Sequence, residues 1–169
     1  QANRLHGGGV IALDSDYAGV DLRLGGNPHP ALEWSIGLNS EGQRQWRRGF
    51  ENFIGSTLGV RGALRREQRD TVWNLDGHAQ LAWMPAPRVQ LQAGLRHSRV
   101  QFASDDRYLA AGNPDDSGAV AYHRSTPVAG LGIGLSENLR WHLALGRGLE
   151  TPTFNELAYR ADGGAGLAL

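Results

Sequence analysis

The chain has 169 residues and no cysteine, so disulfide frameworks and thiolate metal sites are excluded. Its 17 arginines balance 17 acidic residues, and this formal net charge of zero argues against nucleic-acid binding through a broad positive field. No run of eighteen apolar residues is present, which excludes a transmembrane helix, whereas 24 glycines and 7 prolines favour strands and turns.

Apolar and polar residues alternate along about seven stretches of the chain, as they do in strands whose two faces meet different surroundings. No helical periodicity separates these stretches. The sequence therefore predicts an all-β, antiparallel fold. The predicted strands cover residues 20–24, 32–38, 58–65, 73–83, 88–96, 130–135 and 139–146.

The strand over 73–83 carries a tryptophan at each end of its apolar face, Trp73 and Trp83, with smaller apolar residues between them. Ten residue steps at about 3.3 Å each span about 33 Å. Tilted by about 45°, that length projects to about 23 Å, close to the ~25 Å apolar band of a transmembrane β-barrel. We expect the two rings to lie at the two membrane interfaces.

Connections of two lengths alternate along the chain. Short turns rich in Pro, Gly, Asn and Ser are predicted at 25–30, 85–88 and 136–138, and long polar connections at 40–56, at 103–121 and from 150 onward. Short turns at one end and long loops at the other are typical of membrane barrels. A soluble sandwich or lipocalin-like barrel would also show alternation, so the tryptophans and this asymmetry favour the membrane barrel.

Several motifs resemble catalytic or cofactor-binding sites but lack the remaining parts. "HGGG" at 6–9 has no G-x-S-x-G partner, and "GLGIG" at 130–134 lacks the third glycine and the helix of a dinucleotide loop. Six histidines are scattered, and the paired aspartates at 105–106 and 115–116 do not follow a calcium-loop pattern. No catalytic site, metal site or cofactor is predicted.

The most specific motif is "GRGLETPTFNELAYR" at 146–160. It follows a predicted strand and contains a proline, whose missing N–H cannot take part in strand pairing, so the strand is expected to end there. The motif resembles a signature in the barrels of TonB-dependent outer-membrane receptors. Segments 17–24, 76–98 and 115–133 are also similar to successive barrel segments of that family. The motif is most similar to a siderophore-receptor subgroup that includes importers of pyrroloquinoline quinone. Its family-specific residues are Glu150, Thr151, Pro152, Thr153, Asn155, Glu156 and Leu157.

The resemblance implies a bacterial outer-membrane barrel of 22 strands, closed by a plug domain and energised through TonB, that imports a ligand such as a ferric siderophore. It implies a transporter, not an enzyme. Residues 1–169 are expected to be part of the barrel domain, without the plug, the TonB box and the C-terminal strands. Seven strands are too few to close even an eight-stranded membrane barrel, so an interior segment of a larger receptor is predicted.

Ligand contacts are expected on the long-loop side, where arginine would pair with anionic oxygens and aromatic rings would stack on a flat ligand. Polar residues of the inward row, including Glu33, Arg61, Arg65, Asp76 and Arg96, are expected to line the lumen or contact the plug. An outer-membrane barrel enzyme and a soluble all-β binding domain remain alternatives. The expected ligand contacts are Trp46, Arg47, Arg48, Phe50, Tyr108, Tyr159 and Arg160.

Overall fold

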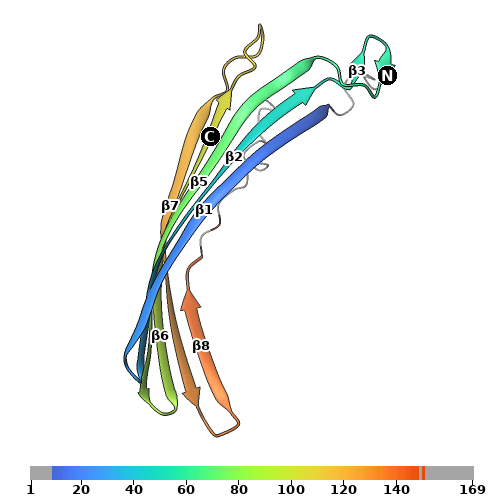
Figure 1. Cartoon of the computed structure of the whole chain (residues 1–169). Helices are drawn as coiled ribbons and strands as arrows, with labels where there is room; N and C mark the ends of the chain where they lie inside the picture. Colours follow the sequence, from blue (N-terminus) through green and yellow to red (C-terminus); the bar gives the residue numbers. More distant parts are fainter. Residues whose placement is uncertain (1–8, 149, 151–169) are drawn as a thin grey trace.

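The computed structural model describes residues 9–148 and residue 150. Six long antiparallel strands form one sheet in the order β1-β2-β5-β6-β7-β8, so each strand pairs with its neighbours in sequence. The sheet is strongly curved and open at both edges, like a section of a cylinder wall (Figure 1). The strands are β1 (Val10–His29), β2 (Leu32–Phe50), β5 (Leu64–Ala86), β6 (Val89–Asp106), β7 (Gly118–Gly134) and β8 (Arg140–Gly146). A separate small hairpin joins β3 (Phe53–Ile54) to β4 (Thr57–Leu58).

The described residues thus confirm the predicted all-β, antiparallel barrel segment, and they contain no helical span with the length and hydropathy that membrane crossing requires. The strand predicted over 58–65 is wrong. β4 ends at Leu58, and β5 begins only at Leu64. Gly59 interrupts the stretch with a φ of +79°, and a Cβ at Gly62 would overlap the Phe53 carbonyl oxygen. The alternating residues at 58–65 therefore lie mostly in the connection between β4 and β5.

The predicted long connections are also shorter than expected. β2 continues to Phe50, and β6 continues to Asp106 before β7 begins at Gly118. Backbone hydrogen bonds to β5 extend both strands, because ladder pairing does not require apolar side chains. The 40–56 and 103–121 segments are therefore largely strand, and only about 51–63 and 107–117 form the connections.

The three short turns lie together at the lower end of the sheet, whereas the two long connections lie at the upper end (Figure 1). Two-residue turns occupy 30–31 and 87–88, and a bend covers 135–139 between β7 and β8. Each turn contains or adjoins Pro, Gly, Asn or Ser, the residues that favour tight reversals. The predicted asymmetry between the two ends is thus present in the fold.

One face of the sheet carries the buried polar side chains, which identifies it as the concave face. Residues directly opposite each other across neighbouring strands share a face, and the register places Asp76 opposite Asn39 and Ser98, and Asp70 opposite Gln45 and Ser104. Neighbouring side chains crowd together on the inside of a curved sheet, so they shield one another there. The buried polar residues on this concave face are Ser35, Gln68, Asp70, Asp76, Ser98 and Ser104.

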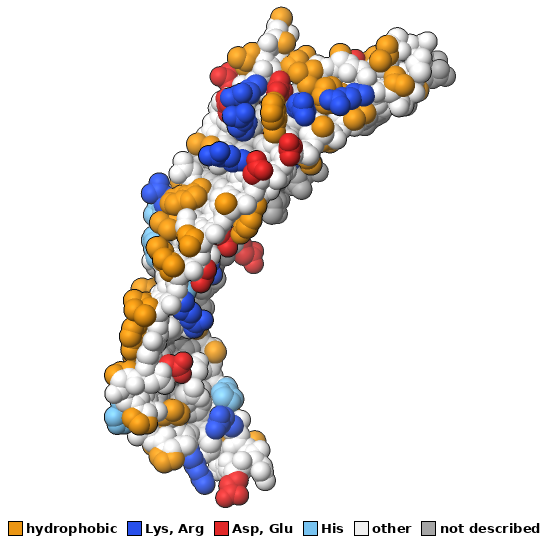
Figure 2. Space-filling view, viewed as in Figure 1, with side chains coloured by type: hydrophobic (Ala, Val, Ile, Leu, Met, Phe, Trp, Pro, Cys, Tyr) orange, Lys and Arg blue, Asp and Glu red, His pale blue; other side chains and the backbone are white. Residues whose placement is uncertain are grey.

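The opposite, convex face carries a band of exposed apolar side chains. Trp73 and Trp83 lie on it with 39% and 47% exposure, near the two ends of the band on β5. Figure 2 shows hydrophobic side chains along the convex edge of the molecule. Their depth in a membrane stays a prediction. The other large members of this apolar band are Leu22, Leu24, Ile36, Leu38, Leu81, Leu91, Leu95, Trp141, Leu143 and Leu145.

Candidate ligand-binding pocket on the concave wall

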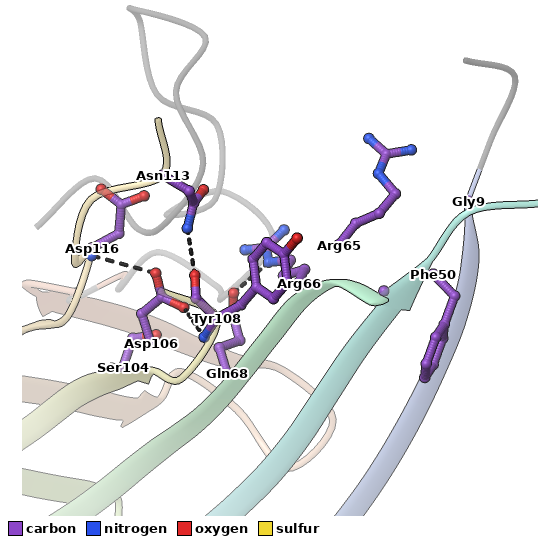
Figure 3. A pocket seen from close by; sticks show the side chains of 11 residues that line it. Gly9, Phe50, Arg65, Arg66, Gln68, Ser104, Asp106, Tyr108, Asn113 and Asp116 are labelled. Atoms are coloured by element: carbon purple, nitrogen blue, oxygen red, sulfur yellow. Dashed lines mark hydrogen bonds between the residues drawn. The ribbon is translucent and has the colours of Figure 1, made fainter. Parts of the chain in front are cut away.

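A pocket of about 270 Å³ lies on the concave face at the end of the sheet that carries the long connections, and Figure 3 shows its lining side chains. The ends of β2, β5 and β6 form its floor, and the 107–117 connection forms one wall. The pocket thus lies on the side of the sheet that carries the long connections. It is lined by Gly9, Gly49, Phe50, Arg65, Arg66, Gln68, Ser104, Asp106, Tyr108, Asn113 and Asp116.

A chain of polar side chains forms the floor. Arg66 Nε donates a hydrogen bond to Gln68 Oε1, and Gln68 Nε2 in turn donates to both carboxylate oxygens of Asp70 at 2.8 Å. The Ser104 hydroxyl donates to Asp70 Oδ1 at 2.7 Å. Asp70 is only 1% exposed, and these donors offset the loss of its water. The network holds Gln68 and Arg66 in place on β5.

Asp106 ties the 107–117 connection to the end of β6. Its Oδ1 accepts a hydrogen bond from the Tyr108 backbone N–H at 3.0 Å, and its Oδ2 accepts one from the Asp116 N–H at 3.4 Å. Asn113 Nδ2 donates to the Tyr108 carbonyl oxygen at 2.6 Å. These bonds replace ladder pairing at the end of β6 and keep Tyr108 beside the pocket (Figure 3).

Two arginines at and beside the floor, Arg66 and Arg47, are incompletely paired. Burial lowers the pKa of the Arg66 guanidinium and the nearby charge of Arg47 lowers it further, while Asp70, Asp106 and Asp116 oppose the shift. Arg47 lies opposite Gln68 in the β2–β5 register and donates from Nη2 to Gln45 Oε1 at 3.3 Å. Arg47 Nε and Arg66 Nη2 are buried without a hydrogen-bond acceptor among the described residues. Buried, unpaired guanidinium N–H groups favour the binding of an anionic ligand that can accept their hydrogen bonds.

The structure does not bring all the expected ligand contacts together. Arg47 lies on the concave face and Tyr108 lines the pocket. Trp46 and Arg48, the neighbours of Arg47 on β2, lie on the convex face. There Trp46 Nε1 donates to Glu67 Oε1 at 3.1 Å, and the Arg48 guanidinium lies 4.9 Å from the centre of the Trp46 ring. These contacts fit a packing role for Trp46 and Arg48.

Phe50 lies at the edge of the pocket, but its ring points away from the labelled Arg65, Arg66 and Tyr108 side chains (Figure 3). It is buried, and the Arg61 guanidinium stacks over it at 3.6 Å from the ring centre. Glu150 is exposed outside the strands. Tyr159, Arg160 and the motif residues Thr151, Pro152, Thr153, Asn155, Glu156 and Leu157 lie outside the described residues.

A second polar cluster lies lower on the concave face, at the level of the apolar band. Asp76 accepts hydrogen bonds from Arg96 Nε at 3.1 Å and from Arg96 Nη2 at 2.7 Å, and Asn74 Nδ2 donates to it at 2.8 Å. Asp76 is 2% exposed, whereas the Arg96 side chain is 57% exposed. Arg96 therefore presents charge to the space in front of the concave wall.

Sequence reasoning missed Arg66, Gln68, Asp70 and Ser104. The alternation of the 73–83 strand continues in phase through "RREQRD" at 65–70, and that continuation would have placed Gln68 and Asp70 on the same face as Asp76. The polar composition of 65–70 hid the strand. Among the described residues, no group of three or more His, Asp or Glu side chains is arranged to hold a metal ion.

A protein-family model described as "TonB dependent receptor-like, beta-barrel" matches residues 3–168 of the chain. The chain belongs to this family. TonB-dependent receptors are active-transport receptors of the bacterial outer membrane, and membership implies that location and that general role. The convex apolar band then faces lipid, and the concave wall faces the interior of the barrel. The family as a whole carries out transport, not catalysis.

Proposed function

We propose that the chain forms part of the barrel wall of a TonB-dependent receptor that imports a small anionic ligand, and that Arg47, Arg66 and Tyr108 contact this ligand above the membrane. Three guanidinium nitrogens are buried without acceptors among the described residues, and two of them, Arg47 Nε and Arg66 Nη2, lie on the concave face; these two carry the proposal. A ferric siderophore with anionic oxygens fits this chemistry, and pyrroloquinoline quinone, with its carboxylates, is the alternative.

The open edges of the sheet support a position inside a larger barrel. β1 and β8 each have a paired neighbour on one side only within the described residues. Unpaired backbone groups facing hydrocarbon cost several kcal/mol each, so a membrane-embedded sheet requires further strands at both edges. We propose that these strands, a plug domain inside the barrel and TonB complete the receptor. The apolar convex band argues against a soluble all-β domain.

The proposed enzyme alternative finds no support in the pocket. The described serine–histidine contact, 2.9 Å between His97 Nδ1 and Ser125 Oγ, lies on the convex face, away from the pocket. The pocket contains no histidine among its described lining residues. Proton transfer at neutral pH commonly uses histidine, and binding needs only the donors already present.

Two adjacent arginines on β2 provide the test, because Arg47 lies on the concave face and Arg48 on the convex face. The intact receptor that carries this chain would be purified in detergent and titrated with a ferric tricatecholate, a ferric trihydroxamate, ferric citrate and pyrroloquinoline quinone. Tryptophan fluorescence would report binding. Arg47→Gln and Arg66→Gln should each weaken binding of the preferred anionic probe about tenfold, because each removes a charged hydrogen bond.

Arg48→Gln is the matched control: Arg48 Nε is also buried without an acceptor, but Arg48 lies on the convex face beside the Trp46 ring, so the affinity should change less than about twofold. Preference for the uncharged trihydroxamate complex, or equal effects of Arg47→Gln and Arg48→Gln, would contradict the proposed pocket. Uptake of the radiolabelled probe by cells with and without TonB would test the transport role separately.

A further inference from the structure

A patch of hydrogen-bond donors lies on the convex face of β6 and β7, beyond the last apolar residue of the band on these two strands. The register places His97 opposite Ser125 and Arg99 opposite His123, so the four side chains form two adjacent rows. The His97 and His123 rings lie 6.4 Å apart, and His97 Nδ1 lies 2.9 Å from Ser125 Oγ. All four residues are exposed. We call these residues the convex patch.

On β6 and β7 the convex patch begins one side-chain position beyond the last apolar residue of the band, whereas on β5 the band continues to Trp73, which lies opposite Gln101. On β6 the last apolar residue of the band is Leu95, two residues before His97, and on β7 it is Pro127, two residues after Ser125. The long connections lie at this same end of the sheet (Figure 1). In a barrel whose long loops face the outside, Arg99 lies one side-chain position below the level of Trp73, from which its long side chain can extend to the headgroups of the outer leaflet.

No carboxylate faces Arg99 from the elements packed beside it. Its direct register partners are Leu75 on β5 and His123 on β7, and its neighbours on the same face of β6 are His97 and Gln101. The diagonal neighbours on β5 and β7 are also uncharged. These diagonal neighbours are Trp73, Gly77, Ala121 and Ser125.

The arginines on the other half of the convex face have different surroundings. Arg44 on β2 lies directly opposite Asp16 on β1. Arg48 and Arg69 both approach the ring of Trp46, whose Nε1 is bound to Glu67. Figure 2 likewise shows red and blue side chains intermixed in the upper part of the molecule, and blue and pale-blue side chains on the convex edge with hydrophobic ones beside and below them. Arg99 thus has its positive charge available for an external anion.

We propose that the convex patch binds the phosphate of a phosphorylated lipid headgroup in the outer leaflet. The Arg99 guanidinium supplies the charge and a forked set of donors that matches phosphate oxygens. The two imidazoles and the Ser125 hydroxyl supply further hydrogen bonds. The acyl chains of the same lipid would lie against Leu95 and Pro127. This inference rests on the proposed membrane orientation of the sheet but not on the identity of the imported ligand.

The test compares lipid retention by the intact receptor in detergent. Native mass spectrometry would count bound molecules after incubation with bisphosphorylated lipid A, with the same lipid lacking both phosphates, and with inorganic phosphate alone. The wild-type receptor should retain the bisphosphorylated lipid, and Arg99→Gln should reduce the affinity about tenfold. Arg99→Lys should retain most of the binding because it keeps the charge.

Arg44→Gln is the matched control, because Arg44 is also on the convex face but has Asp16 opposite it, and it should change retention less than about twofold. Equal retention by wild-type and Arg99→Gln receptors, or equal retention of the lipid without phosphates, would overturn the proposal. Displacement of the lipid by inorganic phosphate alone would also overturn it and would indicate a free-anion site. Binding of the concave-pocket probes should be unchanged in Arg99→Gln, so failure of one proposal is distinguishable from failure of the other.

Discussion

The two faces of β5 have opposite surroundings although their residues alternate along a single strand. Asp76 on the concave face is 2% exposed and fully hydrogen-bonded, whereas Trp73 and Trp83 on the convex face leave 39% and 47% of their surface uncovered. In a soluble protein the polar residues would be the exposed ones. The difference fits an apolar face that lipid covers in the barrel, and it shows that the buried carboxylates of the polar face are stabilised by lateral hydrogen bonds.

The largest expected effect comes from placing a charge on the convex face. Ala79→Arg, near the middle of the band on β5, should destabilise the intact receptor by about 2–4 kcal/mol, because the guanidinium would enter hydrocarbon. Gln80→Arg, one residue further on the concave face, should change stability by less than about 0.5 kcal/mol. Urea unfolding of receptor in lipid vesicles, followed by tryptophan fluorescence, measures both. Similar losses for the two variants would show that the faces do not differ in this way.

A smaller effect is expected from removing the buried carboxylate on the concave face. Asp76→Ala deletes the hydrogen bonds from Arg96 and Asn74, and we expect a loss of about 1–2 kcal/mol in the free energy of unfolding. The expected loss is modest because the Arg96 side chain is 57% exposed, so water can solvate its charge once Asp76 is removed.

Asp21→Ala provides the control, since Asp21 is on the same face and exposed, with a single long contact of 3.5 Å from Asn39. It should cost less than about 0.5 kcal/mol. The same denaturant titration compares the two variants. If Asp21→Ala costs as much as Asp76→Ala, lateral hydrogen bonding does not explain how the concave face tolerates burial.

The smallest expected effect concerns the connection above the sheet. The Ser117 side chain and its backbone N–H, which donates to Asp115 Oδ1 at 2.9 Å, hold the pKa of the Asp115 carboxyl below its usual range. Because the folded pKa is lowered, this contribution is complete above the unfolded pKa of about 3.9 and is lost as the pH falls through the folded pKa.

We therefore expect hydrogen exchange at the Ser117 amide, corrected for its intrinsic rate, to lose protection as the pH falls below about 4. Asp115→Asn, which cannot ionise, should show no such dependence over the same interval. Parallel profiles for the two proteins would mean that Asp115 ionisation does not order this connection.

Local sequence patterns predicted much of this architecture because they depend on neighbouring residues. Alternation separates the two faces of a strand whatever its partners are, and Trp73, Leu81 and Trp83 were assigned to one face on that basis. Turn residues at 25–30 and 85–88 predicted the two reversals, although β1 continues to His29 and β5 to Ala86, so the turns themselves cover only 30–31 and 87–88. The family motif at 146–160 carried the general transport role, which the family match to residues 3–168 supports independently.

Strand pairing decided what the sequence left open. β2 continues through "GQRQWRRGF" at 42–50 because β1 and β5 supply backbone partners on both sides, and this continuation sends Arg47 and Trp46 to opposite faces. The floor of the pocket likewise joins Asp70 to Ser104, 34 positions away, through the β5–β6 register. Burial and hydrogen bonding depend on neighbours across the sheet, and a sequence pattern contains no information about those neighbours until the register is known.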